Sequence, residues 1–161
     1  MVLVPAGEFI MGSQPGTYIF GDNEAPQRRV RLKAFYIDKF EVTNALFRKK
    51  ITPTESYSGT FGKPAQPIVG VTWFQAKQYC ALAGKRLPTE AEWEKAARGK
   101  DGRPFPWGDA PANCDLAVMG DEVPSCSRGY ATWEVGSRPR GASPYGAMDM
   151  AGNVMEWVSD W

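Results

Sequence analysis

The sequence predicts an α+β fold that is irregular and loop-rich, with short strands and two or three short helices. Two observations predict it. Among the 161 residues, 17 are glycine and 13 are proline; both shorten regular elements, because glycine costs backbone entropy and proline lacks the N–H. Aromatic residues make up 12% of the chain, including six tryptophans. Because each large ring buries about 150–250 Å², we expect one domain over residues 1–161, held by aromatic packing.

The composition excludes several classes of protein and site. Charged residues make up 23% of the chain and the net charge is +1, so we expect no nucleic acid as a partner. No apolar run approaches the roughly 18 residues of a membrane helix, so we expect no membrane insertion. The chain contains no histidine. This excludes a histidine-dependent triad and histidine-ligated zinc or iron within it.

The first 40 residues predict short strands separated by a loop. Residues 2–11 indicate two strands around a Pro-Ala-Gly turn, and residues 13–27 carry loop-forming glycine, proline, aspartate and asparagine. Residues 28–40 alternate in polarity, which is typical of a half-buried strand. Its apolar side holds Val30, Leu32 and Ala34, and its basic side holds Arg29, Arg31 and Lys33.

Two helices are predicted by threonine N-caps. Thr43 precedes a short helix over residues 44–50. Thr72 is followed three residues later by glutamine, which makes a capping box for a helix over residues 73–83, and Gly84 ends it. The buried face of this second helix is expected to hold Trp73, Ala76, Cys80 and Ala83.

A third helix is predicted over residues 90–98. Thr89 and the glutamate three residues later form another capping box, and Gly99 ends the helix. From residue 99 to residue 161 we predict no helix, because glycine, proline, asparagine, aspartate and serine recur every few residues. A run of this length without regular structure is unusual, so we expect a bound metal or a disulfide to stabilise it.

A series of longer motifs spans nearly the whole chain. The motifs are Phe9-Ile-Met-Gly12, Glu41-Val-Thr-Asn44, Val71-Thr-Trp73, Gly84-Lys-Arg-Leu-Pro-Thr-Glu-Ala-Glu-Trp-Glu94, Ala97-Arg-Gly99, Pro106-Trp-Gly108, Ala112-Asn113, Val135-Gly-Ser137 and Tyr145-Gly-Ala-Met-Asp-Met-Ala-Gly-Asn-Val-Met-Glu-Trp157. In this order they resemble the formylglycine-generating enzyme or sulfatase-modifying factor family. The resemblance implies a fold related to C-type lectins and calcium as a structural ion. In the founding enzymes it implies oxidation of a sulfatase cysteine to formylglycine with O₂ and copper, which soft thiolates suit.

The resemblance also implies what this chain lacks. The catalytic cysteines of the family lie downstream of the motif that ends at Trp157, in a C-terminal segment that this chain does not include. We therefore expect a C-terminally truncated domain that is inactive as given and that needs this segment of its own chain. Copper is expected only in a full-length parent, with a sulfatase or other peptide as substrate. Cys80 matches a structural half-cystine of the family whose partner also lies downstream.

The other two cysteines, Cys114 and Cys126, are twelve residues apart. From the residues alone they are either two free buried thiols or a local disulfide. Some members of the family have a disulfide near this place, so our hypothesis is the disulfide. A loop of this size would contribute about 3 kcal/mol.

Residues 149–156 form the strongest candidate site. By itself this segment reads either as a solvated acidic turn or as a calcium site, because calcium takes six to eight oxygens from carboxylates and backbone carbonyls. The resemblance favours calcium. Carried over by motif, the ligands are the Asp149 side chain, the Gly152 and Val154 carbonyls and the Glu156 side chain.

A second calcium site of the family is matched only in part. Asn113 and the Cys114 carbonyl match its first half, and Tyr130 supplies a carbonyl for its second half. Arg128, or a gap, stands where the family has aspartate. Arginine cannot bind calcium, so this second site is expected to be incomplete.

Membership of such a family leaves the function open among different classes. The first hypothesis is part of a formylglycine-generating oxidoreductase. The alternative is a non-enzymatic binding or sensor module with a C-type-lectin-like fold, and a third is an accessory domain in another oxidative pathway. The chain is also expected to expose apolar surface around Trp157 and Trp161.

Overall fold

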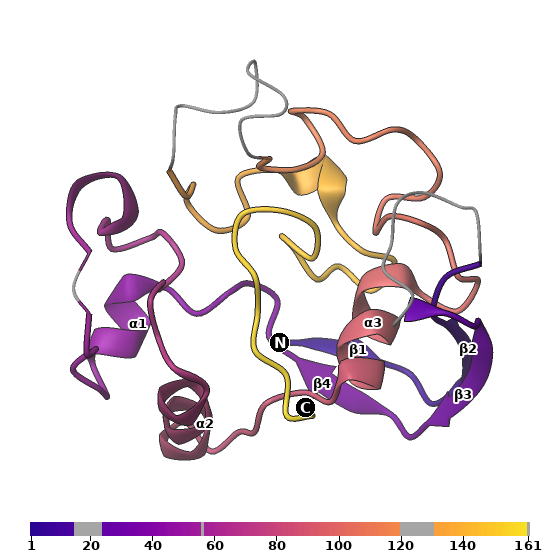
Figure 1. Ribbon diagram of the computed structural model, residues 1–161, viewed down its shortest axis with the longest axis horizontal. Helices are drawn as coiled ribbons and strands as arrows, with labels where there is room; N and C mark the ends of the chain where they lie inside the picture. The colour runs from indigo at the N-terminus through magenta and orange to yellow at the C-terminus, as the bar shows by residue number, and fades with distance from the viewer. Residues whose placement is uncertain (15–23, 56, 120–130, 161) are drawn as a thin grey trace.

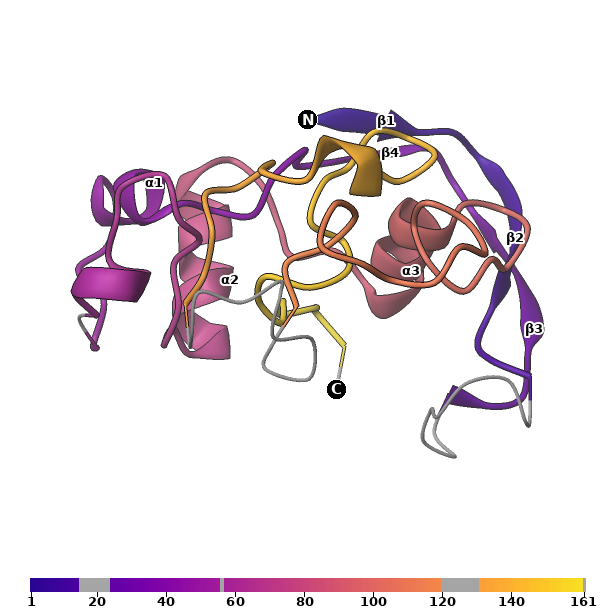
Figure 2. The same ribbon diagram turned by 90° about the horizontal axis from the view of Figure 1, so that it is seen from above.

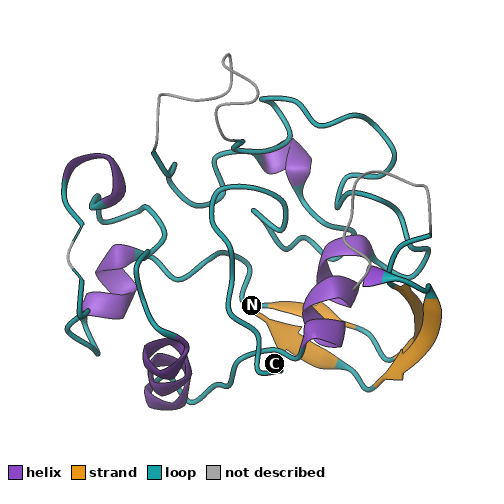
Figure 3. Cartoon of the chain, in the orientation of Figure 1, coloured by secondary structure: helices purple, strands orange, loops and turns teal. Residues whose placement is uncertain are grey.

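The computed structural model describes residues 1–14, 24–55, 57–119 and 131–160 (Figure 1). Its strands are β1 (Val2–Val4), β2 (Gly7–Met11), β3 (Arg28–Leu32) and β4 (Phe35–Ile37), its helices are α1 (Asn44–Arg48), α2 (Trp73–Leu82) and α3 (Glu90–Arg98), and its 3-10 turns are η2 (Gly59–Phe61) and η3 (Pro139–Gly141). Loops connect these short elements over most of the chain (Figure 3). The predicted α+β class with little regular structure is confirmed.

The four strands make two antiparallel pairs, β1 with β4 and β2 with β3. Val4 faces Phe35 in the first pair and Gly7 faces Leu32 in the second. The two pairs therefore share one register, and they form a single long hairpin with a break in the middle. The predicted Pro-Ala-Gly turn is the break in one arm of this hairpin.

Lys95 of α3 bridges the two sides of that break. Its side chain is 2% exposed, and its Nζ donates hydrogen bonds to the carbonyls of Pro5 at 2.8 Å and Gly7 at 3.0 Å. Burial lowers the pKa of the Lys95 ammonium. The backbone groups that leave the ladder at the break thus obtain a donor from the helix, as buried carbonyls require.

The hydrophobic core lies between the hairpin and α3, which run side by side in Figures 1 and 2. Val4, Ala96 and Ala147 have no exposed surface. Small alanines on α3 let the helix approach the hairpin closely, and Trp93 and Phe35 pack at the edge of this cluster. The predicted alternation holds within β3, where Arg29 and Arg31 are exposed, but Ala34, predicted on the apolar side, is exposed and the strand predicted over residues 28–40 is broken at residues 33–34.

The predicted helix starts are confirmed at all three threonines. Thr43 Oγ1 accepts from the N–H of Leu46, and both capping boxes, at Thr72 and at Thr89, are formed on both sides. The ends differ slightly. The helix predicted over residues 44–50 ends at Arg48, because the N–H groups of Lys50 and Ile51 both turn back to the Phe47 carbonyl. None of the described helices is long and apolar enough to cross a bilayer.

The buried face predicted for α2 was partly wrong. Trp73, Ala76, Cys80 and Ala83 are only half-buried, and the buried residue of this helix is Tyr79. Tyr79 stacks on Phe47 of α1 with ring centroids 5.2 Å apart. This partner lies in another helix, so helical periodicity did not identify it.

The last described residues lie across the starts of α2 and α3. Trp73 Nε1 donates to the Val158 carbonyl at 2.8 Å, and Trp157 Nε1 donates to the Val71 carbonyl at 2.9 Å. The N–H of Ser159 reaches the Pro88 carbonyl at 2.8 Å. Trp157 is docked by this bond although half of its surface is exposed, as predicted for this tryptophan; Trp161 lies outside the described residues.

Candidate metal site

The segment from Asp149 to Glu156, called the acidic bend below, has no regular structure and two sharp backbone features. Asp149 and Asn153 both have φ of +59°, and Gly152 has φ of +93°. A Cβ atom on Gly152 would lie 2.2 Å from the carbonyl oxygen of Val118. Gly152 is therefore required both by its conformation and by the close approach of a neighbouring segment.

Asp149 is held inside the protein. It is 8% exposed, and its Oδ2 accepts a hydrogen bond from the N–H of Gly136 at 2.6 Å. Burial raises the pKa of the Asp149 carboxyl, which this hydrogen bond and the charge of Arg138 partly offset. The carboxylate keeps part of its negative charge uncompensated.

Glu156 stands at the other end of the acidic bend. Its Oε2 accepts a hydrogen bond from Trp93 Nε1 of α3 at 3.1 Å. Glu156 is exposed to solvent and lines a cavity of about 370 Å³, with other protein atoms packed around its carboxylate. This crowding, followed by the charge of Asp149, raises the pKa of Glu156 to about 7.

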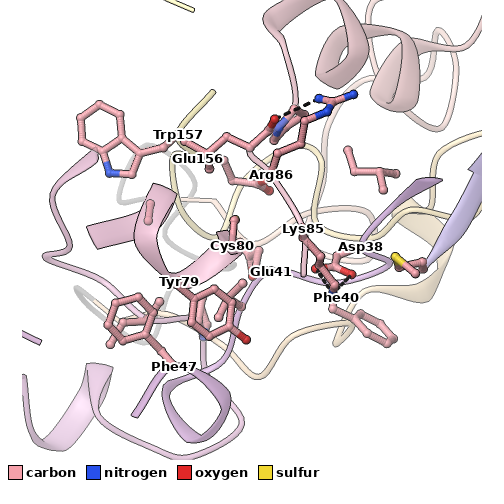
Figure 4. Close-up of a pocket in the computed structure, with 18 of the residues that line it drawn as sticks. Asp38, Phe40, Glu41, Phe47, Tyr79, Cys80, Lys85, Arg86, Glu156 and Trp157 are labelled. Atoms are coloured by element: carbon pink, nitrogen blue, oxygen red, sulfur yellow. Dashed lines mark hydrogen bonds and ion pairs between the residues drawn. The ribbon is translucent and has the colours of Figure 1, made fainter. Parts of the chain in front are cut away.

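A third carboxylate, Glu41, meets the acidic bend from the segment between β4 and α1. Its Oε2 accepts a hydrogen bond from Asn153 Nδ2 at 2.6 Å, and its Oε1 is buried without a hydrogen-bond partner. Burial raises the pKa of Glu41 to about 9, with further contributions from the charges of Asp149 and Glu156. Figure 4 shows Glu41 and Glu156 among the residues that line the same cavity.

Asn153 joins the three segments that surround this cluster. Besides its bond to Glu41, its Oδ1 accepts from the N–H of Trp133 at 2.9 Å, and its own N–H donates to the Val118 carbonyl at 2.8 Å. Sequence reasoning did not assign a role to Glu41 or Asn153. Both stand in quoted motifs, but their partnership spans 112 residues, and no local pattern indicates it.

The structure therefore brings the predicted Asp149 and Glu156 into electrostatic contact and adds Glu41 to them. Asp149 is not among the residues that line the cavity, whereas Glu41, Val154 and Glu156 are. Across the described part of the chain, no three acidic or thiol side chains come together as a complete metal centre. A cation here would need backbone carbonyl oxygens as well, which is how calcium is usually bound.

Of the second predicted calcium site, the structure describes only Asn113 and Cys114. Asn113 Oδ1 accepts from the N–H of Asp115 at 3.0 Å, and the Asn113 carbonyl accepts from the N–H of Leu116. Its side chain therefore caps a local turn. Tyr130 and Arg128 lie outside the described residues.

The cysteines are in two different states. Cys114 is disulfide-bonded; Cys126 lies outside the described residues, so its pairing with Cys114 stays a prediction. Cys80 is a free thiol, half-buried, in the same cavity as Glu41 (Figure 4). Burial, with the nearby charge of Asp38, raises the pKa of the Cys80 thiol. A raised thiol pKa leaves little thiolate at neutral pH, and thiolate is the form that attacks carbon or binds metal.

Comparison with known proteins identifies a single family over the whole chain. The family model described as "Sulfatase-modifying factor enzyme 1-like domain" matches residues 1–161. The chain is 34% identical to the formylglycine-generating enzyme of Bos taurus over 217 aligned positions, which include 100% of this chain and 58% of that protein. The chain thus spans a little over half the length of this relative.

Two further relatives have names that differ from that of the formylglycine-generating enzyme. The hercynine oxygenase of Mycolicibacterium smegmatis is 33% identical, with 98% of this chain and 45% of that protein aligned. The serine/threonine-protein kinase pkn1 of Chlamydia pneumoniae is 35% identical, with 100% of this chain and 28% of that protein aligned.

Among solved structures, PvdO from Pseudomonas aeruginosa superposes with a TM-score of 0.78 at 30% identity, covering 98% of this chain and 69% of that one.

Proposed function

The chain belongs to the sulfatase-modifying factor enzyme 1-like family, and from this premise we propose that it is a formylglycine-generating-type domain whose acidic bend is held by structural calcium. One observation supports the calcium most directly. Glu41 is buried beside two other carboxylates, and its Oε1 has no hydrogen-bond partner. A buried carboxylate that is only partly compensated by hydrogen bonds is costly, and a divalent cation would supply positive charge.

The proposed ligands are the side chains of Asp149 and Glu156 with the carbonyls of Gly152 and Val154, while Glu41 adds a further negative charge beside them. All are hard oxygen donors, which suit calcium better than a soft thiophilic metal. Bound calcium would neutralise the mutual repulsion of the carboxylates. Because Glu41 precedes α1 and Glu156 lies beside α3, the ion would join the two halves of the domain.

Thermal melting of the 161-residue chain in chelator and in millimolar calcium tests this proposal. A ligand that binds only the folded state stabilises it by about 2.7 kcal/mol at a hundredfold excess over its Kd. We expect calcium to raise the melting temperature of the wild type but not of E156Q or D149N. E8Q is the matched control, because Glu8 is exposed on β2, and it should respond like the wild type. An identical melt of the wild type with and without calcium contradicts the proposal.

For the whole protein that contains this chain, we propose oxidation of a cysteine in a sulfatase or other peptide to formylglycine. In that reaction copper held by two thiolates would activate O₂. The described residues do not fit a copper pair, because Cys114 is in a disulfide and the free Cys80 has a raised pKa. We therefore propose that these 161 residues do not perform the oxidation by themselves.

The test compares the 161-residue chain with the longest natural protein that contains it. Each is incubated with copper(I), O₂ and a Cys-x-Pro-x-Arg peptide, and conversion of the cysteine is followed by mass spectrometry. We expect conversion by the longer protein only. Conversion by the 161-residue chain alone would contradict its proposed inactivity, and a longer protein that binds copper but leaves the peptide unchanged would contradict the oxidase.

A binding or sensor module is the second candidate. The similarity to the kinase pkn1 favours it, because the aligned region is only 28% of that protein and the rest lies outside the alignment. Similarity to the hercynine oxygenase favours a third role, in another oxidative pathway. A longer protein that binds no copper and still binds a peptide or small molecule would support the module.

A further inference from the structure

A second and larger cavity, of about 760 Å³, lies between β2, the start of α3 and the loop that follows α3. We call it the acidic groove. Figures 1 and 2 both show α3 beside β2 with this loop running alongside. Its size falls in the usual range of ligand sites, about 300–1,000 Å³. The proposed calcium ligands are not among the residues that line the acidic groove.

Apolar side chains from distant parts of the chain line the groove. Ile10 comes from β2, Trp93 from α3, and Phe105 from the loop, while Met150 belongs to the acidic bend. Phe105 stacks on Trp107 with ring centroids 5.0 Å apart and an interplanar angle of 7°, so its ring is held in a fixed orientation. Side chains of this kind give a ligand apolar contact area at little entropic cost.

Two of the five carboxylates that line the groove are already neutralised. Glu94 pairs with Arg98 and accepts from the N–H of Gly12 at 2.8 Å. Asp101 pairs with Arg103 through two bonds of 2.9 and 2.8 Å. Neither carboxylate is available as a strong partner for a further cation.

The other three carboxylates, Glu24, Glu90 and Asp109, remain exposed and form no ion pair with any described residue. Arg28 is the one lining arginine that no carboxylate in the described chain engages; its Nη2 lies 3.4 Å from the Met11 sulfur. Glu24 accepts a hydrogen bond from Ser13 Oγ at 3.3 Å, and Asp109 lies within electrostatic reach of Arg103, so the groove carries an excess of negative charge around its apolar floor. This excess is local, since the whole chain carries a net charge of +1.

We propose that the acidic groove binds a basic peptide segment in which arginine or lysine alternates with apolar side chains. The apolar residues would cover Trp93 and Phe105, and the basic residues would pair with Glu90 and Asp109. A nucleic acid or an acidic peptide would be repelled by the free carboxylates. A small inorganic cation would leave the apolar floor uncovered. The inference rests on the groove alone and does not depend on the proposed function.

The experiment measures fluorescence anisotropy of a labelled hexapeptide of alternating arginine and leucine, titrated with the 161-residue chain at low salt. The same peptide with glutamate in place of arginine serves as the charge control. The test variant is E90Q/D109N. The matched control is E8Q/D115N, which removes two exposed carboxylates elsewhere, near Arg29 and Arg140.

We expect the wild type and E8Q/D115N to bind the basic peptide with the same Kd. E90Q/D109N should bind it about five- to tenfold more weakly, as the loss of two exposed ion pairs implies. Equal thermal melts of both variants verify that the fold is unchanged. Equal weakening in both variants, no binding by the wild type, or equal binding of the glutamate peptide would each overturn the proposal.

Discussion

The hairpin with α3 and the acidic bend stabilise the same domain in different ways. Between the hairpin and α3, apolar side chains such as Val4 and Ala96 have no exposed surface, and the buried ammonium of Lys95 meets two carbonyls. At the acidic bend, the groups brought together are the carboxylates of Glu41, Asp149 and Glu156, which repel one another.

The difference shows which region has a stability that depends on pH and on bound ions. Apolar burial stabilises the hairpin region without a change of protonation state or a bound ion. The stability of the acidic bend depends on protonation or on a bound cation, because like charges in a crowded site cannot all be ionised at no cost. Substitutions in each region, and changes of pH or calcium concentration, can therefore distinguish their contributions to stability.

The largest effect is expected in the acidic bend, from G152A. An added methyl group would lie 2.2 Å from the Val118 carbonyl oxygen, at φ of +93°. We expect a loss of about 3–5 kcal/mol in the free energy of unfolding, measured by urea denaturation. G84A is the control, because Gly84 has φ of +70° but a methyl group added there would have no atom within 4 Å, and it should lose only about 1–2 kcal/mol. Equal losses would mean that the close approach of Val118 is unimportant.

A smaller effect is expected in the hairpin region, from K95M. Methionine keeps most of the buried side chain but removes the donor that serves the Pro5 and Gly7 carbonyls. We expect a loss of about 2–3 kcal/mol, since buried carbonyls would lose their partner, and the same loss with or without calcium. K33M, on an exposed residue beside the same break, should change stability by less than about 0.5 kcal/mol. A K95M chain as stable as the wild type would show that the hydrogen bonds of Lys95 do not contribute to stability.

The third prediction is the pH dependence of stability in chelator. The pKa values of Glu41 and Glu156 rise from 4.5 to about 9 and about 7 in the folded chain. Between these values and 4.5 the folded chain holds protons that the unfolded chain has released, so its stability falls as pH rises. From pH 5.5 to 8.5 we therefore expect the melting temperature in chelator to fall steadily, with Glu41 contributing over the whole range and Glu156 mainly below about pH 7.

The double variant E41Q/E156Q tests whether these two residues cause the pH dependence. Its amides do not titrate, so its melting temperature in chelator should change little over the same range. G84A, which leaves all carboxylates in place, should follow the wild type. A wild-type chain whose stability rises with pH would show that these carboxylates do not determine the pH dependence of stability.

Much of the fold was predictable because its signals are local. A threonine N-cap and a glutamate or glutamine three residues later contact only neighbouring backbone, so Thr72 and Thr89 indicated two helix starts correctly. The absence of helix after Gly99 was also predicted, and the described residues there contain only the 3-10 turn η3. Local chemistry determines these features whatever the rest of the chain does.

The buried face of α2 was harder to predict because its partner is remote. Periodicity pointed to Cys80 and its neighbours, yet the structure buries Tyr79 against Phe47 of α1. Which face of a short helix is buried depends on what packs against it. That information is not contained in the helix itself.

The sequence by itself determined the class of fold, the helix starts and the acidic bend with its Asp149, Gly152 and Glu156. Only the tertiary structure decided that Glu41 joins this bend through Asn153, across 112 residues, and that Lys95 spans the break in the hairpin. The physical reason is the separation along the sequence over which each interaction acts. Caps and turns act over a few residues, whereas the burial and mutual repulsion of carboxylates arise only after packing brings remote segments together.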